Sequence, residues 1–266
     1  DDINLLKSEF LENMILAILQ ARLSSSRLPN KVLKSILGKP MLLHQVERTQ
    51  HSKKIDKLVI ATSDNVSDDA IEKMCLDNNI EVFRGDLNNV LDRFYQCTRS
   101  FKPDHVVRLT GDCPLADWQI IDNMIQCYLD KKLDYMATSL NFPDGLDVEV
   151  MTMKALAEAK YHATLPSELE HVTQYINKKN TKFKIEYFDF DKELSHLRWT
   201  VDEPEDFALV EKIYEALYEI NPLFLTNDIL DLLKRQPELT RINDSFIRNE
   251  GLEKSIQEDK VFLKNV

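Results

Sequence analysis

The chain has 266 residues, of which 43% are hydrophobic and 30% are charged, and its formal net charge is −11. A chain of this length can bury a core that folds without disulfides or a structural metal, as one large α/β domain or one domain with an appendage. The acidic balance argues against a nucleic-acid-binding surface, which needs a broad basic footprint, but a local cluster of cations can still bind a small anionic ligand.

The first strand signal follows a polar segment, residues 1–13, which we expect to flank the fold. From Met14 onward, short apolar runs alternate with amphipathic stretches. The runs predict buried strands over residues 15–19, 57–62, 81–83, 105–109 and 134–138. The stretches between them predict helices around residues 42–49, 70–75, 90–98 and 120–128. This alternation predicts a mostly parallel sheet with right-handed crossovers.

The pattern changes after about residue 140. A turn at Pro143-Asp144-Gly145 precedes an alternating run that predicts a strand over 146–150. The remaining predicted elements are helices near 153–162 and 168–179, strands over 182–188 and 197–201, and a helix that begins at Pro204. The segment from residue 221 is charged and helical in pattern. We therefore expect one domain over residues 14–220 and a helical C-terminal extension over residues 221–266.

Four cysteines occur and none forms a CxxC pair, so a zinc site is not expected. The patterns around Cys75, Cys97 and Cys127 are helical, and buried thiols there fit a reducing compartment. The apolar run at 14–19 is too short to span a membrane, and the acidic opening lacks the basic start of a signal peptide. We expect a cytoplasmic protein with no membrane partner and no nucleic-acid partner.

The loop that directly follows the first strand carries three cations and three consecutive serines. Ligands of open α/β sheets bind beyond the carboxyl ends of the strands, so this loop is placed to form a site. Arg22 and Arg27 can fork onto phosphate oxygens, and Lys31 can act as a mobile point charge. The loop lacks the glycines of a Walker motif and of a dinucleotide-binding fingerprint. The alternative is a solvated basic surface loop.

Two aspartates each follow a predicted strand. Asp112 lies just after the strand at 105–109, next to Gly111, and Asp202 lies just after the last predicted strand. A hard cation such as Mg²⁺ favours one or two carboxylates together with phosphate oxygens and water, so this pair could supply a magnesium site. The alternatives are an Asx-turn at Asp112 and an N-cap of the following helix at Asp202.

Further polar side chains lie on strand faces that could open to the same site. Arg108 alternates to the same face as Asp112 and could neutralise phosphate, contact a base edge or form a plain salt bridge. Asp147 and Glu149 are two residues apart, so a strand would place both on one face. That face would line a cavity or, in an edge strand, meet solvent.

Three motifs together resemble one known family. Residues 21–31 fit the pattern A-R-x-x-S-x-R-x-P-x-K, while G-D-x-P begins at Gly111 and V-D-x-P-E-D begins at Val201. From about residue 14 to about residue 260 the chain is similar to the CMP-sugar synthetase (cytidylyltransferase) superfamily, which includes the CMP-Kdo and CMP-acylneuraminate synthetases. The variant Gln20-Ala21-Arg22 is most similar to the spore-coat polysaccharide biosynthesis protein F branch. One departure is Asn30, where glycine is common, and this residue would change how tightly the loop turns.

The resemblance implies a three-layer α/β/α Rossmann-like nucleotidyltransferase fold, GT-A-like, with a helical C-terminal tail. It also implies CTP as the nucleotide, Mg²⁺ bound by Asp112 and Asp202 as the cofactor, and a homodimer. We expect catalytic roles for Arg22, Lys31 and Asp112. The expected nucleotide contacts are Ala21, Arg22, Ser24, Ser25, Arg27, Lys31, Arg84, Arg108 and Gly111. The expected acceptor contacts are Asp147, Glu149, His171, His196 and Arg198. For His171, the alternative is a partly buried structural histidine.

We therefore expect a Mg²⁺-dependent cytidylyltransferase for surface polysaccharide biosynthesis. It would move CMP from CTP to a sugar acid, or to a related polyol or sugar phosphate, and release pyrophosphate. The acceptor oxygen would attack the α-phosphorus in line, and positioning with charge neutralisation would supply most of the rate. One alternative is a glycosyltransferase, but Asp147-Val148-Glu149 only approximates the D-x-D-type metal motif. The other alternative is a nucleotide-binding protein without catalysis.

Overall fold

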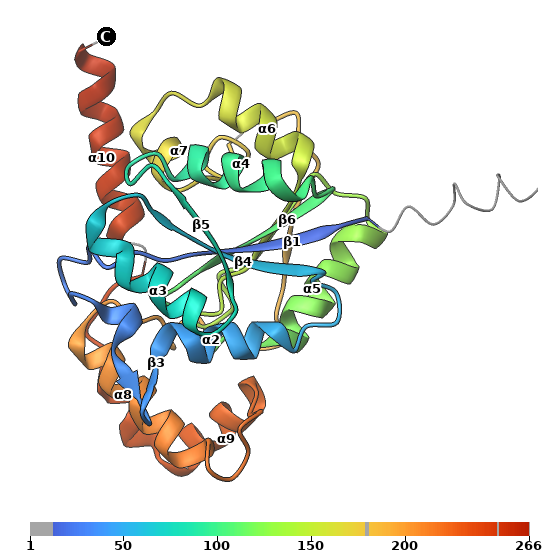
Figure 1. The fold of residues 1–266 in the computed structure, drawn as a ribbon. Coiled ribbons are helices and arrows are strands. Elements are labelled where there is room, and N and C mark those ends of the chain that lie inside the picture. Colours follow the sequence, from blue (N-terminus) through green and yellow to red (C-terminus); the bar gives the residue numbers. More distant parts are fainter. Residues whose placement is uncertain (1–12, 179–180, 249, 266) are drawn as a thin grey trace, which may run out of the picture.

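A mixed sheet forms the centre of the fold. The structure is a computed structural model that describes residues 13–178, 181–248 and 250–265, so most of the expected flanking segment lies outside the described residues. Within these ranges, seven strands form one sheet in the order β5-β4-β1-β6-β8-β7-β9 (Figure 1). In chain order they are β1 Ile15–Gln20, β4 Lys57–Ser63, β5 Glu81–Gly85, β6 His105–Thr110, β7 Tyr135–Thr138, β8 Glu149–Thr152 and β9 Ile185–Phe188. Every pairing is parallel except the two made by β8, which confirms the mostly parallel sheet.

Helices cover both faces of this sheet because its central strands are apolar on both sides. On β1, Ala17 and Leu19 belong to one face and Leu16 and Ile18 to the other, and all four are fully buried. The helices on the first face are α2 Met41–Gln50, α3 Asp69–Asp77, α5 Trp118–Asp130, α8 Pro204–Leu217 and α9 Thr226–Arg235. Those on the second face are α4 Val90–Phe101 and α6 Met153–His162, above the sheet in Figure 1. The predicted three-layer α/β/α fold is confirmed.

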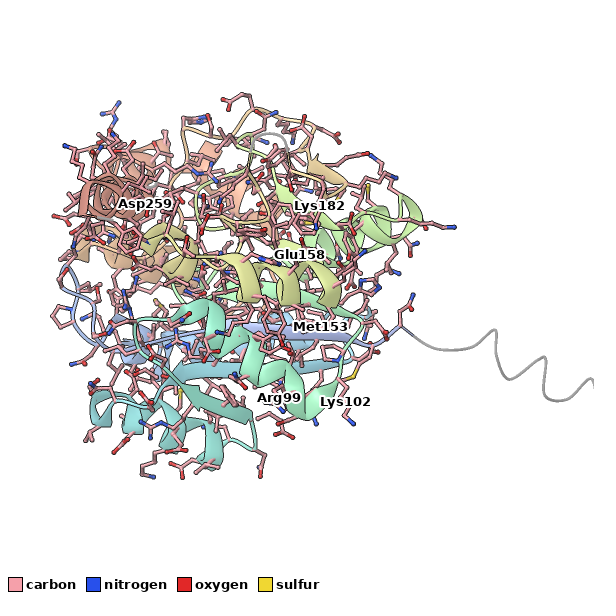
Figure 2. The ribbon with its side chains drawn as sticks, turned by 90° about the horizontal axis from the view of Figure 1, so that it is seen from above. Arg99, Lys102, Met153, Glu158, Lys182 and Asp259 are labelled. Atoms are coloured by element: carbon pink, nitrogen blue, oxygen red, sulfur yellow. The ribbon has the colours of Figure 1, made fainter. Side chains whose placement is uncertain are left out.

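Shorter elements and the C-terminal helix complete the structure. They are η1 Lys31–Leu33, β2 Ser35–Ile36, β3 Lys39–Pro40, η2 Val66–Asp68, α7 Pro166–Glu170, η3 Pro237–Arg241 and α10 Glu250–Asn265. α10 packs against α7, where the amide and hydroxyl of Ser167 donate to Asp259 at 2.9 and 2.6 Å (Asp259 is labelled in Figure 2). In the part of the chain that the structure describes, no helix is both long enough and apolar enough to cross a membrane.

Several predicted elements have different extents in the structure. The strand predicted over 197–201 is a single bridge between Arg198 and Asp144, and its apolar pattern reflects burial of Trp199 and Val201 in the core. The helix predicted over 168–179 is represented by α7, which ends before Val172, a residue in the left-handed region with φ 59. The strands predicted over 146–150 and 182–188 are confirmed in part, as β8 and β9.

The strand order reverses its direction next to β1. The chain steps from β1 outward to β4 and β5 and then returns to β6 on the other side of β1. Such a switch point leaves a crevice beyond the carboxyl ends of the two strands. Gly111, just after β6, donates its amide to the Gln20 carbonyl at 2.8 Å, and a Cβ at Gly111 would come within 3.0 Å of that oxygen. The ends of β1 and β6 therefore lie side by side at the crevice.

Candidate active site

A cavity of about 530 Å³ opens beyond the carboxyl ends of β1 and β6. Loop 20–31, the segment after β6, and residues around β7, β8, α7 and the start of α10 form its wall. The structure brings most of the predicted site residues together on this wall. They are Ala21, Arg22, Ser24, Ser25, Arg27, Lys31, Arg108, Gly111, Asp112, Asp147, Glu149, His171, Arg198 and Asp202.

The loop that follows β1 is tied to the neighbouring strand β4. Leu23 N donates to Asp68 Oδ1 at 2.7 Å, and the buried Asp68 carboxylate also accepts from Ser63 N at 3.2 Å. Asn30 adopts the left-handed conformation, with φ 57 and ψ 21. Asparagine tolerates this region better than most residues, so Asn30 makes the kind of turn that glycine would make.

Lys31 lies between the two predicted metal ligands. Its Nζ donates to Asp202 Oδ1 at 2.8 Å and to the Val201 carbonyl at 2.7 Å, and it lies 3.5 Å from Asp112 Oδ2. Burial alone would lower the pKa of Lys31, but the charges of the two aspartates raise this pKa above its ordinary value. Burial alone would raise the pKa of Asp112, but the Lys31 ammonium and hydrogen bonds hold this pKa below its usual value. Lys31 and Asp112 are therefore both charged at neutral pH.

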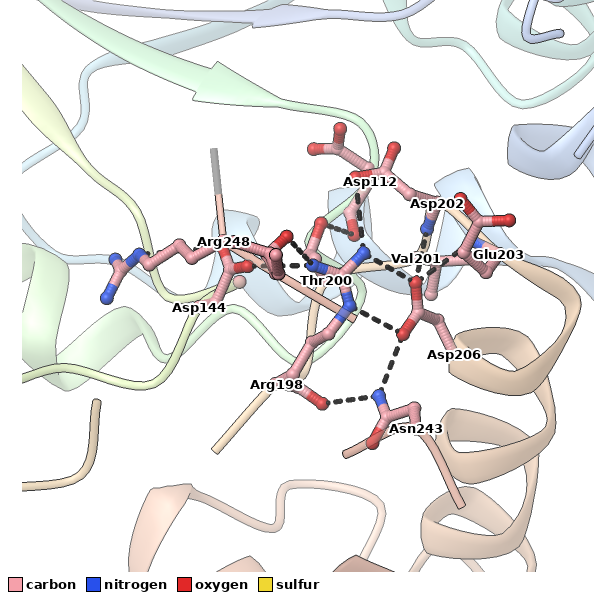
Figure 3. A network of polar contacts seen from close by, with 12 residues as sticks. Asp112, Asp144, Arg198, Thr200, Val201, Asp202, Glu203, Asp206, Asn243 and Arg248 are labelled. Atoms are coloured by element: carbon pink, nitrogen blue, oxygen red, sulfur yellow. Dashed lines mark hydrogen bonds and ion pairs between the residues drawn. The ribbon is translucent and has the colours of Figure 1, made fainter. Parts of the chain in front are cut away.

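Asp202 faces the cavity because another aspartate caps α8. Asp206 Oδ2 accepts from the backbone amides of Asp202 and Glu203 at 3.0 and 2.9 Å (Figure 3). The Asp202 carboxylate does not cap the helix, but contacts Lys31 and lies 3.1 Å from Arg27 Nη2. Asp112 and Asp202 thus converge with the cations of the first loop.

The converging carboxylates fit a magnesium ion. Asp112 and Asp202 offer hard oxygen ligands from two different segments and approach the same ammonium group. Among the described residues, no cluster of three His, Cys, Asp or Glu side chains could hold a metal by itself. A pair of carboxylates suits a metal that completes its shell with phosphate oxygens and water, as Mg²⁺ does, rather than a closed structural site.

Arg198 is the centre of a buried ion-pair network next to the cavity (Figure 3). Its Nε and Nη2 donate to Asp206 at 2.8 and 2.9 Å, and its Nη1 donates to Asp144 Oδ2 at 3.1 Å. Asn243 joins the network by donating to Asp206 Oδ1 at 2.8 Å. Because each nitrogen of the guanidinium already has an acceptor, this geometry suits Arg198 for fixing the Asp202–Asp206 segment rather than for reaching an acceptor molecule.

Glu149 and Arg108 form an ion pair on the opposite side of the cavity. This is the salt bridge that the sequence left as an alternative for Arg108. Tyr135 Oη and Thr173 Oγ1 also donate to Glu149, and Arg108 Nε donates to Gln20 Oε1 at 3.2 Å. The carboxylate of Glu149 therefore holds Arg108 in place.

Two other predicted acceptor residues contact the C-terminal region. Arg248 Nη2 donates to Asp147 Oδ1 at 2.9 Å, and His171 Nε2 lies 3.0 Å from Ser255 Oγ. Burial first, and then the positive charge of Arg108, lower the pKa of His171 below its ordinary value, so the imidazole is neutral at pH 7. Sequence reasoning missed Arg248 because Asp147 is 101 residues away along the chain.

Arg84 and His196 do not line the cavity. The Arg84 guanidinium donates to the Ser63 carbonyl at 2.9 Å and to Asp69 and Glu72 at 2.6 and 2.8 Å. It therefore ties β5 to α3, toward the edge of the sheet. The side chain of His196 is 66% exposed and lies on another part of the surface.

Comparisons with known proteins point to one family. A family model described as cytidylyltransferase matches residues 16–231. The spore coat polysaccharide biosynthesis protein SpsF of Bacillus subtilis is 35% identical over 233 residues, which cover 85% of this chain and 96% of that protein. A 3-deoxy-manno-octulosonate cytidylyltransferase of Pelobacter propionicus is 34% identical over 124 residues, 47% of this chain and 48% of that protein. The structure of a cytidylyltransferase from Leptospira borgpetersenii has a TM-score of 0.82 at 28% identity, covering 88% of this chain and 99% of that chain.

Proposed function

This chain belongs to the cytidylyltransferase family, and from that premise we propose that it transfers CMP from CTP to a sugar acid or a related polyol or sugar phosphate. The reaction releases pyrophosphate and serves surface polysaccharide biosynthesis. The observation that carries the proposal is the convergence of Lys31, Asp112 and Asp202 in the cavity below the cationic loop. The names of the similar proteins in Bacillus and Pelobacter support the polysaccharide context and the sugar-acid acceptor.

The residues of the cavity have distinct tasks in this proposal. Arg22, Arg27 and Lys31, together with Ser24 and Ser25, bind the triphosphate and neutralise its charge. The acceptor oxygen attacks the α-phosphorus, a new O–P bond forms, and the bond to the pyrophosphate breaks in line with it. Because the protein forms no covalent bond to the substrate, its contribution is positioning and charge stabilisation.

The proposed cofactor is Mg²⁺, held by Asp112 and Asp202. When bound there, the ion supplies charge neutralisation for the phosphate oxygens. We expect a chelator to abolish turnover and added Mg²⁺ to restore it, as measured by pyrophosphate release. Full turnover after exhaustive chelation would contradict the metal assignment.

We also propose a homodimer in the cytoplasm. Exposed apolar side chains on α10, among them Ile256, Val261 and Leu263, support association through this helix. Four free thiols support a reducing compartment. Sedimentation equilibrium of the purified chain tests the dimer, since a single species of monomer mass would contradict it.

The main experiment is a screen of pyrophosphate release with CTP, UTP, ATP and GTP against a panel of sugar acids and sugar phosphates. We expect release with CTP, and we expect Lys31→Ala and Asp112→Ala each to lower the rate by about 10² to 10³ while the fold is retained. Lys73→Ala, an exposed change on α3, is the matched control and should match the parent.

Two results would contradict the proposal. If Asp112→Ala released pyrophosphate at the parent rate, the assignment of the reaction to this cavity would be wrong. If the products contained a nucleoside diphosphate in place of pyrophosphate, the chain would transfer a sugar and not a nucleotide.

A further inference from the structure

Arg93 is a buried cation in the cavity wall that none of the sequence motifs includes. It lies in the first turn of α4, is only 2% exposed, and lines the cavity. Its Nη1 donates to the Asp86 carbonyl at 3.3 Å, while its Nε is enclosed and has no acceptor. In the described parts of the chain, no carboxylate forms an ion pair with Arg93. Burying a charged guanidinium without an ionic partner costs free energy, and a bound anion would offset this cost.

A second cation increases the excess of positive charge at this end of the cavity. Arg22 lines the same wall, and its guanidinium lies 3.8 Å from Glu170 in a partly exposed ion pair. Burial first, and then the charge of Arg22, lower the pKa of Arg93 to about 10, so the Arg93 guanidinium is still charged at pH 7. Asp68, a buried carboxylate whose charge acts on Arg93, already accepts from Leu23 N and Ser63 N.

We propose that Arg93 is a further nucleotide-binding residue that, together with Arg22, donates to phosphate oxygens of the bound triphosphate. Two guanidinium groups on one cavity wall repel each other until an anion lies between them, and the guanidinium fork matches phosphate geometry. A neutral base or ribose would leave the buried charge of Arg93 without an anionic partner. The inference rests on the proposed function for its choice of CTP, but the phosphate class follows from the charges themselves.

Binding measurements on the full chain test this role. The probes are CTP, inorganic tripolyphosphate and cytidine, titrated calorimetrically with and without Mg²⁺. In Arg93→Met we expect the affinity for CTP and for tripolyphosphate to fall by roughly 10- to 100-fold, the value of one charge-assisted contact, while the affinity for cytidine is unchanged. Arg99→Met, on the exposed end of the same helix (labelled in Figure 2), is the matched control and should bind all three probes like the parent.

Each outcome decides the question. Unchanged tripolyphosphate binding by Arg93→Met, or an equal loss for cytidine, would overturn the proposal. If Arg93→Met does not fold, Arg93→Lys is the second variant, because it keeps the charge but loses the paired hydrogen bonds of the guanidinium. Parent-like affinity of Arg93→Lys for tripolyphosphate would also overturn the proposal. If the parent binds tripolyphosphate through Arg93 but turns over no CTP, the proposed function fails while the phosphate contact stands.

Discussion

Glu149 is the residue whose expected role changes most once its neighbours are known. The sequence places it among the acceptor contacts, but Arg108, Tyr135 and Thr173 already donate to its carboxylate. All four residues line the cavity. Because the Glu149 carboxylate already accepts from three side chains, we expect Glu149 to act through Arg108, as a positioning residue.

Glu149→Gln tests whether Arg108 serves the acceptor or the nucleotide. The amide removes the charge partner of Arg108, and the sequence places Arg108 among the nucleotide contacts. We therefore expect the affinity for CTP, measured calorimetrically, to fall about tenfold because one charged hydrogen bond is weakened. The KM for the acceptor should stay at the parent value. Glu158→Gln on α6, which pairs with Lys182 at the surface (both labelled in Figure 2), is the control. A raised acceptor KM with an unchanged affinity for CTP would place Arg108 at the acceptor instead.

For single residues, the sequence identifies site residues that follow predicted strands. It misses site residues that reach the cavity from a packed helix or from the C-terminal segment. Lys31 lies in the loop after β1 and Asp112 follows β6, so two neighbouring parallel strands bring them to one edge. Asp202 reaches the same edge because it follows the buried segment 197–201, where Val201 N donates to the Asp112 carbonyl at 2.8 Å. Arg93 projects from a helix, and Arg248 comes from the C-terminal segment. No local spacing encodes which side chains of such elements face inward, because this depends on how helices pack.

The turn at Pro143-Asp144-Gly145 is the element that brings the Asp202 segment to the sheet. The Asp144 carbonyl accepts from Trp199 N at 2.6 Å and from Thr200 N at 2.8 Å. Gly145 has φ +107, and a Cβ there would lie 2.3 Å from Thr200 N. The close approach of the two segments therefore requires glycine.

Gly145→Ala should destabilise the protein by about 3 kcal/mol or more, because it adds backbone strain and a clash with backbone atoms that cannot move aside. The measurement is the urea midpoint of unfolding, followed by circular dichroism. Gly251→Ala is the matched control, since a Cβ there meets no atom within 4 Å, and its midpoint should equal or exceed that of the parent. Equal midpoints for the two variants would mean that the two segments can separate at little cost.

The segment held by this turn shows why some predicted strands are confirmed and one is not. The apolar runs of β1, β4 and β6 predict buried strands, and in the structure these segments are buried and pair in the sheet. The run at 197–201 has a similar apolar character, but Trp199 and Val201 are buried against the core without a ladder. A strand and a buried extended segment share one sequence pattern, and only tertiary contacts separate them.

For the whole molecule, three buried or partly buried histidines predict how stability depends on pH. Burial is the largest cause that lowers the pKa of His44, His105 and His171 below the ordinary value of 6.5. The unfolded chain takes up these protons as the pH falls through 6.5, whereas the folded chain does not. The stability present above this pH is therefore lost progressively below it.

We expect the urea midpoint to be lower at about pH 5.5 than at about pH 7.5. His105→Gln should reduce this difference by removing one contributing group, while the exposed change His196→Gln should preserve it. A midpoint that does not change between the two pH values would show that these imidazoles titrate alike in both states.

The network around Arg198 also has a consequence for how the protein is made. Asn243 donates both to Asp206 and to the Arg198 carbonyl, so a residue well after this segment in the chain braces the carboxylate-bearing segment. During synthesis, the strands and the cationic loop emerge long before this brace. A nascent or prematurely terminated polypeptide without Asn243 would thus expose an anion-attracting crevice whose acidic half is not yet aligned.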